Sequence, residues 1–119
     1  MTLHKVYRVA TYVPPDAVEH LLAGICGVVQ LRYGNYARSA WWLAAGTEQY
    51  EPVLGAKPSH GEVGKLSRVP SIRVEFCIPR DLELLQQVIT AGLRPNHPWE
   101  EPAIFIDESL VDIRSGTVG

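Results

Sequence analysis

Apolar residues alternate with polar ones in two stretches of the chain. Residues 6–13 combine β-branched and aromatic side chains, and every second residue from Ile72 to Ile78 is apolar. A two-residue period is typical of a strand with one buried face. We therefore predict strands at 6–13 and 72–78.

A helical pattern follows each of these strands. Proline and aspartate at positions 14–16 suit the first turn of a helix, where the ring costs no hydrogen bond and the carboxylate faces the helix dipole. Gly24 and Gly27 are predicted to end the first helix, and Gly92 lies near the end of the second. The predicted apolar faces are Val18, Leu21, Leu22 and Ile25 in the first helix, and Leu82, Leu85, Ile89 and Leu93 in the second.

The two strand–helix units are copies of one pattern. The residues Arg8-Val9, Val13-Pro14 and Asp16 recur at an offset of 65 as Arg73-Val74, Ile78-Pro79 and Asp81. Another strand candidate follows each helix, at 37–45 and at 103–107. The order strand-helix-strand-strand-helix-strand predicts an α+β, ferredoxin-like split βαβ fold. We expect a four-stranded antiparallel sheet with both helices on one face and with Val9 and Val74 on neighbouring strands.

The alternation assigns residues to the two faces of this sheet. The face under the helices is predicted to carry Tyr7, Val9, Thr11, Val13, Ile72, Val74, Phe76 and Ile78. The second face carries Arg8, Ala10, Tyr12, Arg73, Glu75 and Cys77. A monomer would leave that face in water, which indicates an interface. Since buried unpaired charge is costly, Arg8 or Arg73 should pair with Glu75.

Adjacent tryptophans mark the strand predicted at 37–45. Neighbouring residues of a strand point to opposite faces, so we expect one of Trp41 and Trp42 in the core. The other should lie on the second face or at an interface, where tryptophan is enriched.

A long segment separates the two halves of the repeat. Residues 47–53 are predicted to form a small strand that pairs back on 37–45 through a turn at Ala45-Gly46-Thr47. Residues 54–65 form a loop rich in glycine and lysine, and such loops are usually functional or mobile. We expect Lys57 to Lys65 to be the least ordered internal stretch of the chain.

The composition narrows the class of protein. A chain of 119 residues predicts one domain over 1–119, with a core at 5–108 and a frayed tail at 114–119. A net charge of −2 argues against nucleic acid as a partner. No apolar run is long enough for a membrane span, and no signal peptide is recognised, so we expect a cytoplasmic location. Cys26 and Cys77 are expected to be free thiols, as in a reducing compartment.

Three motifs resemble the YqfO family: Gly34-Asn35-Tyr36, the stretch 55–66 with Gly61-Glu62-Val63-Gly64-Lys65, and His97-Pro98-Trp99-Glu100-Glu101-Pro102-Ala103. The resemblance covers about residues 5–108 and implies a fold similar to the PII proteins and to CutA, with assembly as a homotrimer. In many bacteria this domain is inserted in a protein with a dinuclear metal centre. Here it is expected to stand alone, so no catalytic residue is carried over. Trp99 replaces the more usual tyrosine.

The last motif contains the densest set of metal-ligand types in the chain. His97, Glu100 and Glu101 suit a divalent metal such as zinc, copper or manganese, and His60 and Glu62 could complete the site. In the alternative interpretation the glutamates face solvent and His97 hydrogen-bonds a backbone carbonyl.

The glycine-rich loop is a candidate ligand site. Glycines let backbone amides approach an anion, and a lysine adds charge, although the spacing is not that of a P-loop. PII relatives bind effectors in clefts beside an equivalent loop. The candidate ligand-binding residues are Lys57, His60, Gly61, Glu62, Gly64, Lys65 and Trp99. The alternative is a flexible hairpin whose glycines only meet backbone demands.

No catalytic set emerges from the sequence. Ser39, Ser59 and Ser67 lack the context of a nucleophile, and a pairing of Cys77 with His97 or His60 has no support. We expect a non-enzymatic trimer that binds a small ligand or a partner protein. Two alternatives stay open: a divalent-metal-binding protein related to cation tolerance, and a purely structural oligomerisation module.

Overall fold

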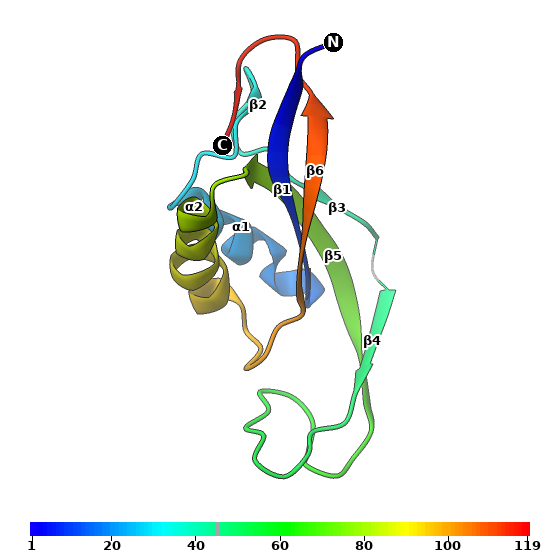
Figure 1. Ribbon diagram of the computed structural model, residues 1–119. Coiled ribbons are helices and arrows are strands. Elements are labelled where there is room, and N and C mark those ends of the chain that lie inside the picture. Colours follow the sequence, from blue (N-terminus) through cyan, green and yellow to red (C-terminus); the bar gives the residue numbers. More distant parts are fainter. Residues whose placement is uncertain (45) are drawn as a thin grey trace.

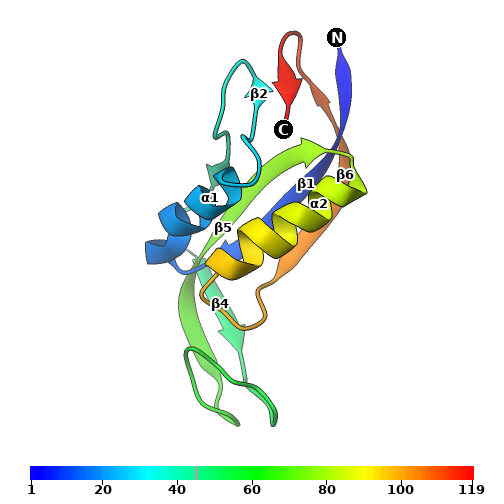
Figure 2. The ribbon, with the colours of Figure 1, turned by 90° about the vertical axis from the view of Figure 1, so that its left-hand side faces the viewer.

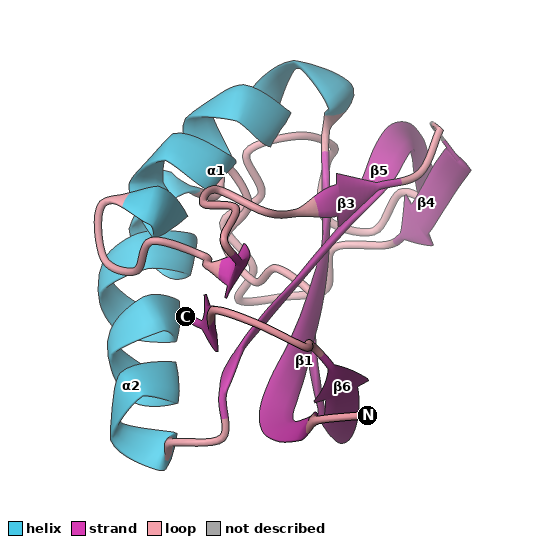
Figure 3. Cartoon of the chain, turned by 90° about the horizontal axis from the view of Figure 1, so that it is seen from above, coloured by secondary structure: helices cyan, strands magenta, loops and turns pink. Residues whose placement is uncertain are grey.

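The computed structural model describes residues 1–44 and 46–119. Two helices cover one face of an antiparallel sheet, and a two-stranded arm extends from one end of it (Figure 1). The molecule is elongated, with extents of 51 × 28 × 22 Å. Seen from above, the helices form one layer and the long strands the other (Figure 3).

The sheet is organised around β1 (Leu3–Val13), which lies between two long antiparallel strands. It pairs with β5 (Ser67–Pro79) on one side and with β6 (Ile104–Asp112) on the other. The short strand β3 (Trp41–Trp42) adds to β5, which gives the order β3-β5-β1-β6. The predicted ferredoxin-like fold is confirmed. Val9 and Val74 lie on neighbouring strands, in a register that pairs Thr11 with Val74.

The helical segments begin where the repeat predicts. A 3₁₀ turn (η1, Pro15–Ala17) leads into α1 (Val18–Cys26). The second segment starts with α2 (Leu82–Gln87), which is capped by the Asp81 carboxylate accepting from the amides of Glu83 and Leu84. It continues as a π-helical turn (η2, Val88–Leu93) and a 3₁₀ turn (η3, Arg94–Asn96).

The helix faces differ from prediction in two places. In the second helix Leu85 and Leu93 are buried as predicted, but Leu82 is exposed, and Val88 at the start of the π-helical turn is fully buried instead. Gly24 does not end the first helix but lies inside it. A Cβ at Gly24 would lie 2.0 Å from Asn96 Nδ2, so the helices meet closely there because this residue lacks a side chain. Gly27 caps the helix as predicted.

The core lies between the helices and the sheet face assigned to them (Figure 2). Val9, Val13, Val74, Phe76 and Ile78 are fully buried there, and Tyr7 and Ile72 pack against them. Thr11 is also fully buried, and its hydroxyl donates to the Ala103 carbonyl at 2.8 Å. The predicted inward face of the sheet is therefore correct.

The second face carries the predicted charges. Glu75 pairs with both arginines, at 3.5 Å from Arg8 Nε and 2.9 Å from Arg73 Nη2. The prediction that one tryptophan enters the core is wrong for the single chain, since Trp41 and Trp42 are 48% and 54% exposed. Their two-residue strand lies at the edge of the sheet, where it pairs with β5.

The arm consists of β4 (Gly46–Tyr50) and the first part of β5. The predicted strand at 47–53 exists in part, but it pairs with residues 67–71 and not back on the strand at 37–45. That strand is shorter than predicted, and the turn expected at 45–47 includes Ala45, which lies outside the described residues. β5 is long enough to pair with β1 in one half and with β4 in the other.

The C-terminal residues are paired, although fraying was expected. The strand β7 (Thr117–Val118) pairs with β2 (Tyr33–Gly34), and the amides of Arg32 and Gly119 each donate to the other's carbonyl. Gly116 permits this contact, because its φ is +89° and a Cβ there would lie 2.3 Å from the Gly34 carbonyl carbon.

Both cysteines are free and partly buried. Within the described part of the chain, no helix has the length and apolar character needed to cross a membrane.

Candidate functional site

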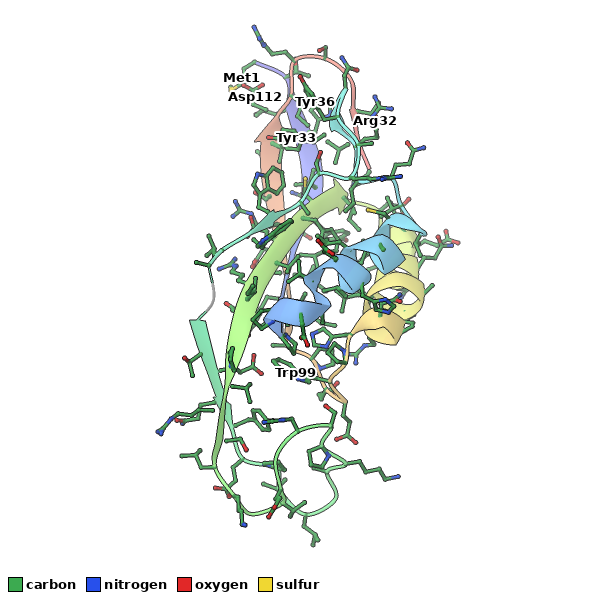
Figure 4. The ribbon with its side chains drawn as sticks, turned by 180° about the vertical axis from the view of Figure 1, so that it is seen from behind. Met1, Arg32, Tyr33, Tyr36, Trp99 and Asp112 are labelled. Carbon is green, nitrogen blue, oxygen red and sulfur yellow. The ribbon has the colours of Figure 1, made fainter. Side chains whose placement is uncertain are left out.

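The long loop of the arm folds back onto the His97–Ala103 motif. The Lys57 amide donates to both carboxylate oxygens of Glu100, at 3.0 and 3.3 Å. Trp99 lies between the helical body and this loop (Figure 4). Two motifs that are far apart in sequence therefore form one site.

The side chain of His97 links the motif to strand β1. Its side chain is buried, with 7% exposed, and Nε2 lies 2.8 Å from the Tyr12 carbonyl. The Trp99 amide donates to Nδ1 at 3.1 Å, so Nδ1 is the acceptor and the Nε2 proton is donated to Tyr12. Burial lowers the pKa of His97, and the hydrogen bond to Tyr12 opposes this only in part. A neutral imidazole thus ties β1 to the turn that presents Trp99.

Two clefts flank the loop and share one wall. The smaller, of about 180 Å³, is lined by Tyr50, Pro52, Trp99, Glu100 and other residues of the arm. The larger, of about 880 Å³, lies against the start of α1 and is lined by His20, Arg68 and Asn96 among others. Ser59, His60 and Trp99 line both clefts. The aromatic and imidazole rings of this wall suit a small ligand with a planar or apolar part.

The predicted metal ligands point to different partners. Both ring nitrogens of His97 are engaged, Glu100 holds the Lys57 amide, and Glu101 pairs with Arg94 at 3.0 Å. Across residues 1–44 and 46–119, no three His, Cys, Asp or Glu side chains gather closely enough to hold an ion. The alternative interpretation of His97, a hydrogen bond to a backbone carbonyl, describes the structure. Metal binding by His97, Glu100 and Glu101 stays a prediction, and it would require one of these contacts to break.

The residues in the glycine-rich part of the loop lie in different surroundings. His60 reaches the clefts, and its carbonyl accepts from the Tyr50 hydroxyl at 2.7 Å. Glu62 and Lys65 instead form an exposed ion pair of 2.8 Å with each other. Gly61 and Gly64 adopt φ of +90° and +82°, so their conformation requires glycine. Of the predicted ligand residues, His60 and Trp99 are brought together, and Lys57 joins them through its backbone. The lining of the two clefts does not include Gly61, Glu62, Gly64 or Lys65.

Strand β4 also contributes to this site, which no motif of the sequence indicated. Tyr50 and Glu48 line the smaller cleft, and burial raises the pKa of Glu48. The Ser71 hydroxyl donates to Glu48 at 3.3 Å and partly offsets that shift. Their place at the cleft follows from the pairing of β4 with β5, which no motif or local pattern of the sequence indicates.

The residues considered for catalysis are dispersed. Ser59 lies at the clefts beside His60, whereas Cys77 lines a different pocket with Arg8 and Glu75 on the second face. Burial raises the pKa of the Cys77 thiol, which disfavours the reactive thiolate. A non-enzymatic role stays a prediction.

Curated relatives match most of this chain. It is 34% identical over 99 residues to the GTP cyclohydrolase 1 type 2 homolog of Bacillus subtilis, covering 83% of this chain and 26% of the relative. The homolog from Mycobacterium tuberculosis is 35% identical over 95 residues, covering 80% and 24%. The chain thus spans about a quarter of the length of the curated relatives it matches. No protein-family model matches it.

Solved structures show the same relationship. A Bacillus cereus protein related to NIF3 aligns over 100% of this chain and 29% of its own length, with a TM-score of 0.71 and 26% identity. GlnK of B. subtilis covers 97% of this chain and 96% of its own, with a TM-score of 0.53 and 15% identity. CutA from Xylella fastidiosa aligns over 94% of this chain and 86% of its own length, with a TM-score of 0.55 and 17% identity. The last two show a shared fold alone.

Proposed function

Because the chain belongs to the YqfO-like family and has the PII/CutA-like fold, we propose that it is a non-enzymatic, trimeric domain that binds a small ligand beside its long loop. The observation that carries this proposal is the wall formed by His60 and Trp99 between two clefts, held in place by the Lys57–Glu100 contact.

Proteins of the same fold give the proposal a precedent. A PII-like protein from Thiomonas intermedia was solved with ADP, AMP and bicarbonate, and it aligns with a TM-score of 0.52 at 12% identity. GlnK of B. subtilis was also solved with ATP, and that structure aligns with a TM-score of 0.50 at 11% identity. The likeness extends to the fold alone. It supports a role in ligand binding for this scaffold and leaves the identity of the ligand to experiment.

The second face of the sheet supports the assembly. Trp41, Leu43 and Phe105 share this face by register, and they are 48%, 64% and 58% exposed. Such an apolar patch marks an interface, and Glu75 beside it pairs with both Arg8 and Arg73, which leaves these three side chains with one net positive charge. We propose a closed cyclic trimer, in which a neighbouring subunit completes the clefts.

Light scattering tests the assembly. A trimer has about three times the chain mass of 13.2 kDa. Trp41→Glu should release monomers, because it buries a charge in the interface, whereas Leu54→Glu at the loop tip should leave the mass unchanged. A monodisperse wild-type monomer at micromolar concentration would refute the trimer.

A thermal-shift screen of small metabolites, nucleotides included, tests ligand binding. A specific ligand at 100 times its Kd should stabilise the protein by about 2.7 kcal/mol. Trp99→Ala should abolish that shift, while Tyr36→Ala, which removes an exposed aromatic ring from the other end of the molecule, should keep it. A trimer that no compound stabilises would favour the purely structural module instead.

A further inference from the structure

The loop between α1 and β3 holds a second cluster of polar side chains, remote from the clefts beside Trp99. A pocket of about 540 Å³ is lined by Cys26, Gln30, Arg32, Asn35, Ala37 and Arg38. Asn35 belongs to the Gly34-Asn35-Tyr36 motif, which the proposed function does not use. Figure 4 places Arg32 beside the C-terminal segment and Trp99 at the opposite end of the helical body.

Most of the side chains that line this pocket carry hydrogen-bond donors, and no acidic side chain balances the charge of its arginines. Two guanidinium groups and two side-chain amides face it, and none of its lining residues is acidic. Among the described residues, no carboxylate lies within 4 Å of a guanidinium nitrogen of Arg32 or Arg38. Arg8, Arg73, Arg80 and Arg94 have such a partner, whereas Arg68 and Arg114, like the two arginines of the pocket, have none among the described residues. The two guanidinium groups make the lining of this pocket positively charged, while the Gly119 oxygen accepts from the Arg32 backbone amide at 3.2 Å.

The backbone holds these groups in place. Arg32 donates from Nε and Nη2 to the Gly34 carbonyl, at 3.3 and 3.0 Å, which fixes the plane of its guanidinium. Arg38 has a φ of +58°, a conformation uncommon for residues other than glycine. Its amide donates to the Gln30 carbonyl at 2.8 Å, so the loop doubles back and sets Arg38 opposite Gln30.

We propose that this pocket binds a phosphate group of a small molecule, with Arg32 and Arg38 as its principal ligands. Arginine presents a planar fork of donors that matches phosphate oxygens in pairs. A phosphate offers enough acceptor oxygens for two guanidinium groups and the Gln30 and Asn35 amides together, whereas a carboxylate offers only two. The site is independent of the clefts beside Trp99.

Cys26 provides a reporter inside the pocket. Its thiol is partly buried, and this burial raises the pKa of Cys26, an effect that the positive charge of Arg38 offsets only in part. A bound phosphate would cover the thiol and offset that charge, so alkylation of Cys26 should slow. Cys77 lines another pocket and serves as the internal control for alkylation.

In the test, the full chain is titrated with inorganic phosphate and with pyrophosphate, and chloride keeps the ionic strength constant. Binding is measured by isothermal titration calorimetry, and alkylation of Cys26 is measured by peptide mass spectrometry. Saturable binding that protects Cys26 and spares Cys77 is expected. Arg38→Asn should weaken it by about tenfold or more, since charge-assisted bonds are lost while asparagine tolerates a positive φ. Arg114→Asn, which removes an exposed charge outside the pocket, should change it by less than about twofold.

Arg38→Lys keeps the charge but loses the fork, and it should still weaken binding several-fold. It serves where Arg38→Asn fails to fold. The proposal is overturned if neither phosphate nor pyrophosphate saturates, if the Arg38 variants bind as the wild type does, or if malonate binds as tightly as phosphate.

Discussion

One strand, β5, passes through two different environments. Its second half pairs with β1 and sends Val74, Phe76 and Ile78 into a fully buried core beneath the helices. Its first half pairs with β4 in the arm, where the neighbouring loop exposes Val53, Leu54, Val63 and Leu66 to solvent. A two-stranded hairpin is only marginally stable in water. The helical body therefore provides most of the stability, and we propose that the arm is the part that adapts to a ligand.

Truncating one large side chain in each region should lower the stability of the protein substantially only in the helical body. Phe76→Ala should lower the free energy of unfolding by about 3–5 kcal/mol, because Phe76 is fully buried. Leu54→Ala, at a residue that is 95% exposed, should change it by less than about 0.5 kcal/mol. Urea unfolding followed by circular dichroism measures both, and similar losses would remove the distinction between body and arm.

Adding a methyl group tests how tightly the helical body is packed. Gly24→Ala should destabilise it by about 1–3 kcal/mol, because the new Cβ collides with Asn96 and disturbs the bond from Asn96 Nδ2 to the Gly92 carbonyl. At Gly27, where the nearest heavy atom lies 3.3 Å away, alanine is the milder control. If Gly24→Ala is as stable as the wild type in thermal unfolding, the helices pack less closely than described.

His97 lies where the two regions meet, and it should make stability depend on pH. Because burial lowers its pKa below the ordinary 6.5, the unfolded chain takes up a proton that the folded chain does not. Stability should thus fall as the pH drops below about 6.5, and level off below the folded-state pKa.

His97→Gln should flatten that profile, since glutamine does not titrate and its amide can still donate toward the Tyr12 carbonyl. Urea midpoints between pH 5 and pH 8 provide the comparison. An unchanged slope in His97→Gln would assign the pH dependence to other groups.

The smallest effect on stability is expected where the loop docks. Glu100→Gln weakens the acceptor for the Lys57 amide, and it should change the free energy of unfolding by less than about 1 kcal/mol. It should nonetheless weaken the binding of any ligand found in the thermal-shift screen, because the loop that lines the clefts loses its contact with Glu100. Glu101→Gln, which removes only the exposed pair with Arg94, is the matched control. Equal losses of affinity in the two variants would count against a specific role of this contact.

The sequence was informative where one local rule decides the structure. The alternation of apolar residues placed Val9, Val74 and Phe76 in the core, and the 65-residue repeat identified the two halves of the fold. It was weaker where distant parts of the chain compete. The π turn that buries Val88, the Asn96 side chain against Gly24 and the pairing of β4 with β5 depend on tertiary contacts that no local pattern encodes.

The site shows the same division. The motifs contain His60 and Trp99, which the structure places together at the clefts, but the separate partners of His97, Glu100 and Glu101 became apparent only from the geometry. Tyr50 and Glu48 were missed, because their place at the cleft follows from the strand pairing and not from a motif.

Amide hydrogen exchange, resolved by residue and repeated with a ligand from the screen, compares the body and the arm directly. We predict slow exchange along the paired stretches of β1 and β5, and fast exchange from Lys57 to Lys65, where backbone hydrogen bonds are exposed. The ligand should slow exchange in that loop and leave the core unchanged. Strong protection of the loop in the free protein, or a loop that no bound ligand slows, would contradict the assignment of the arm as the ligand-binding part.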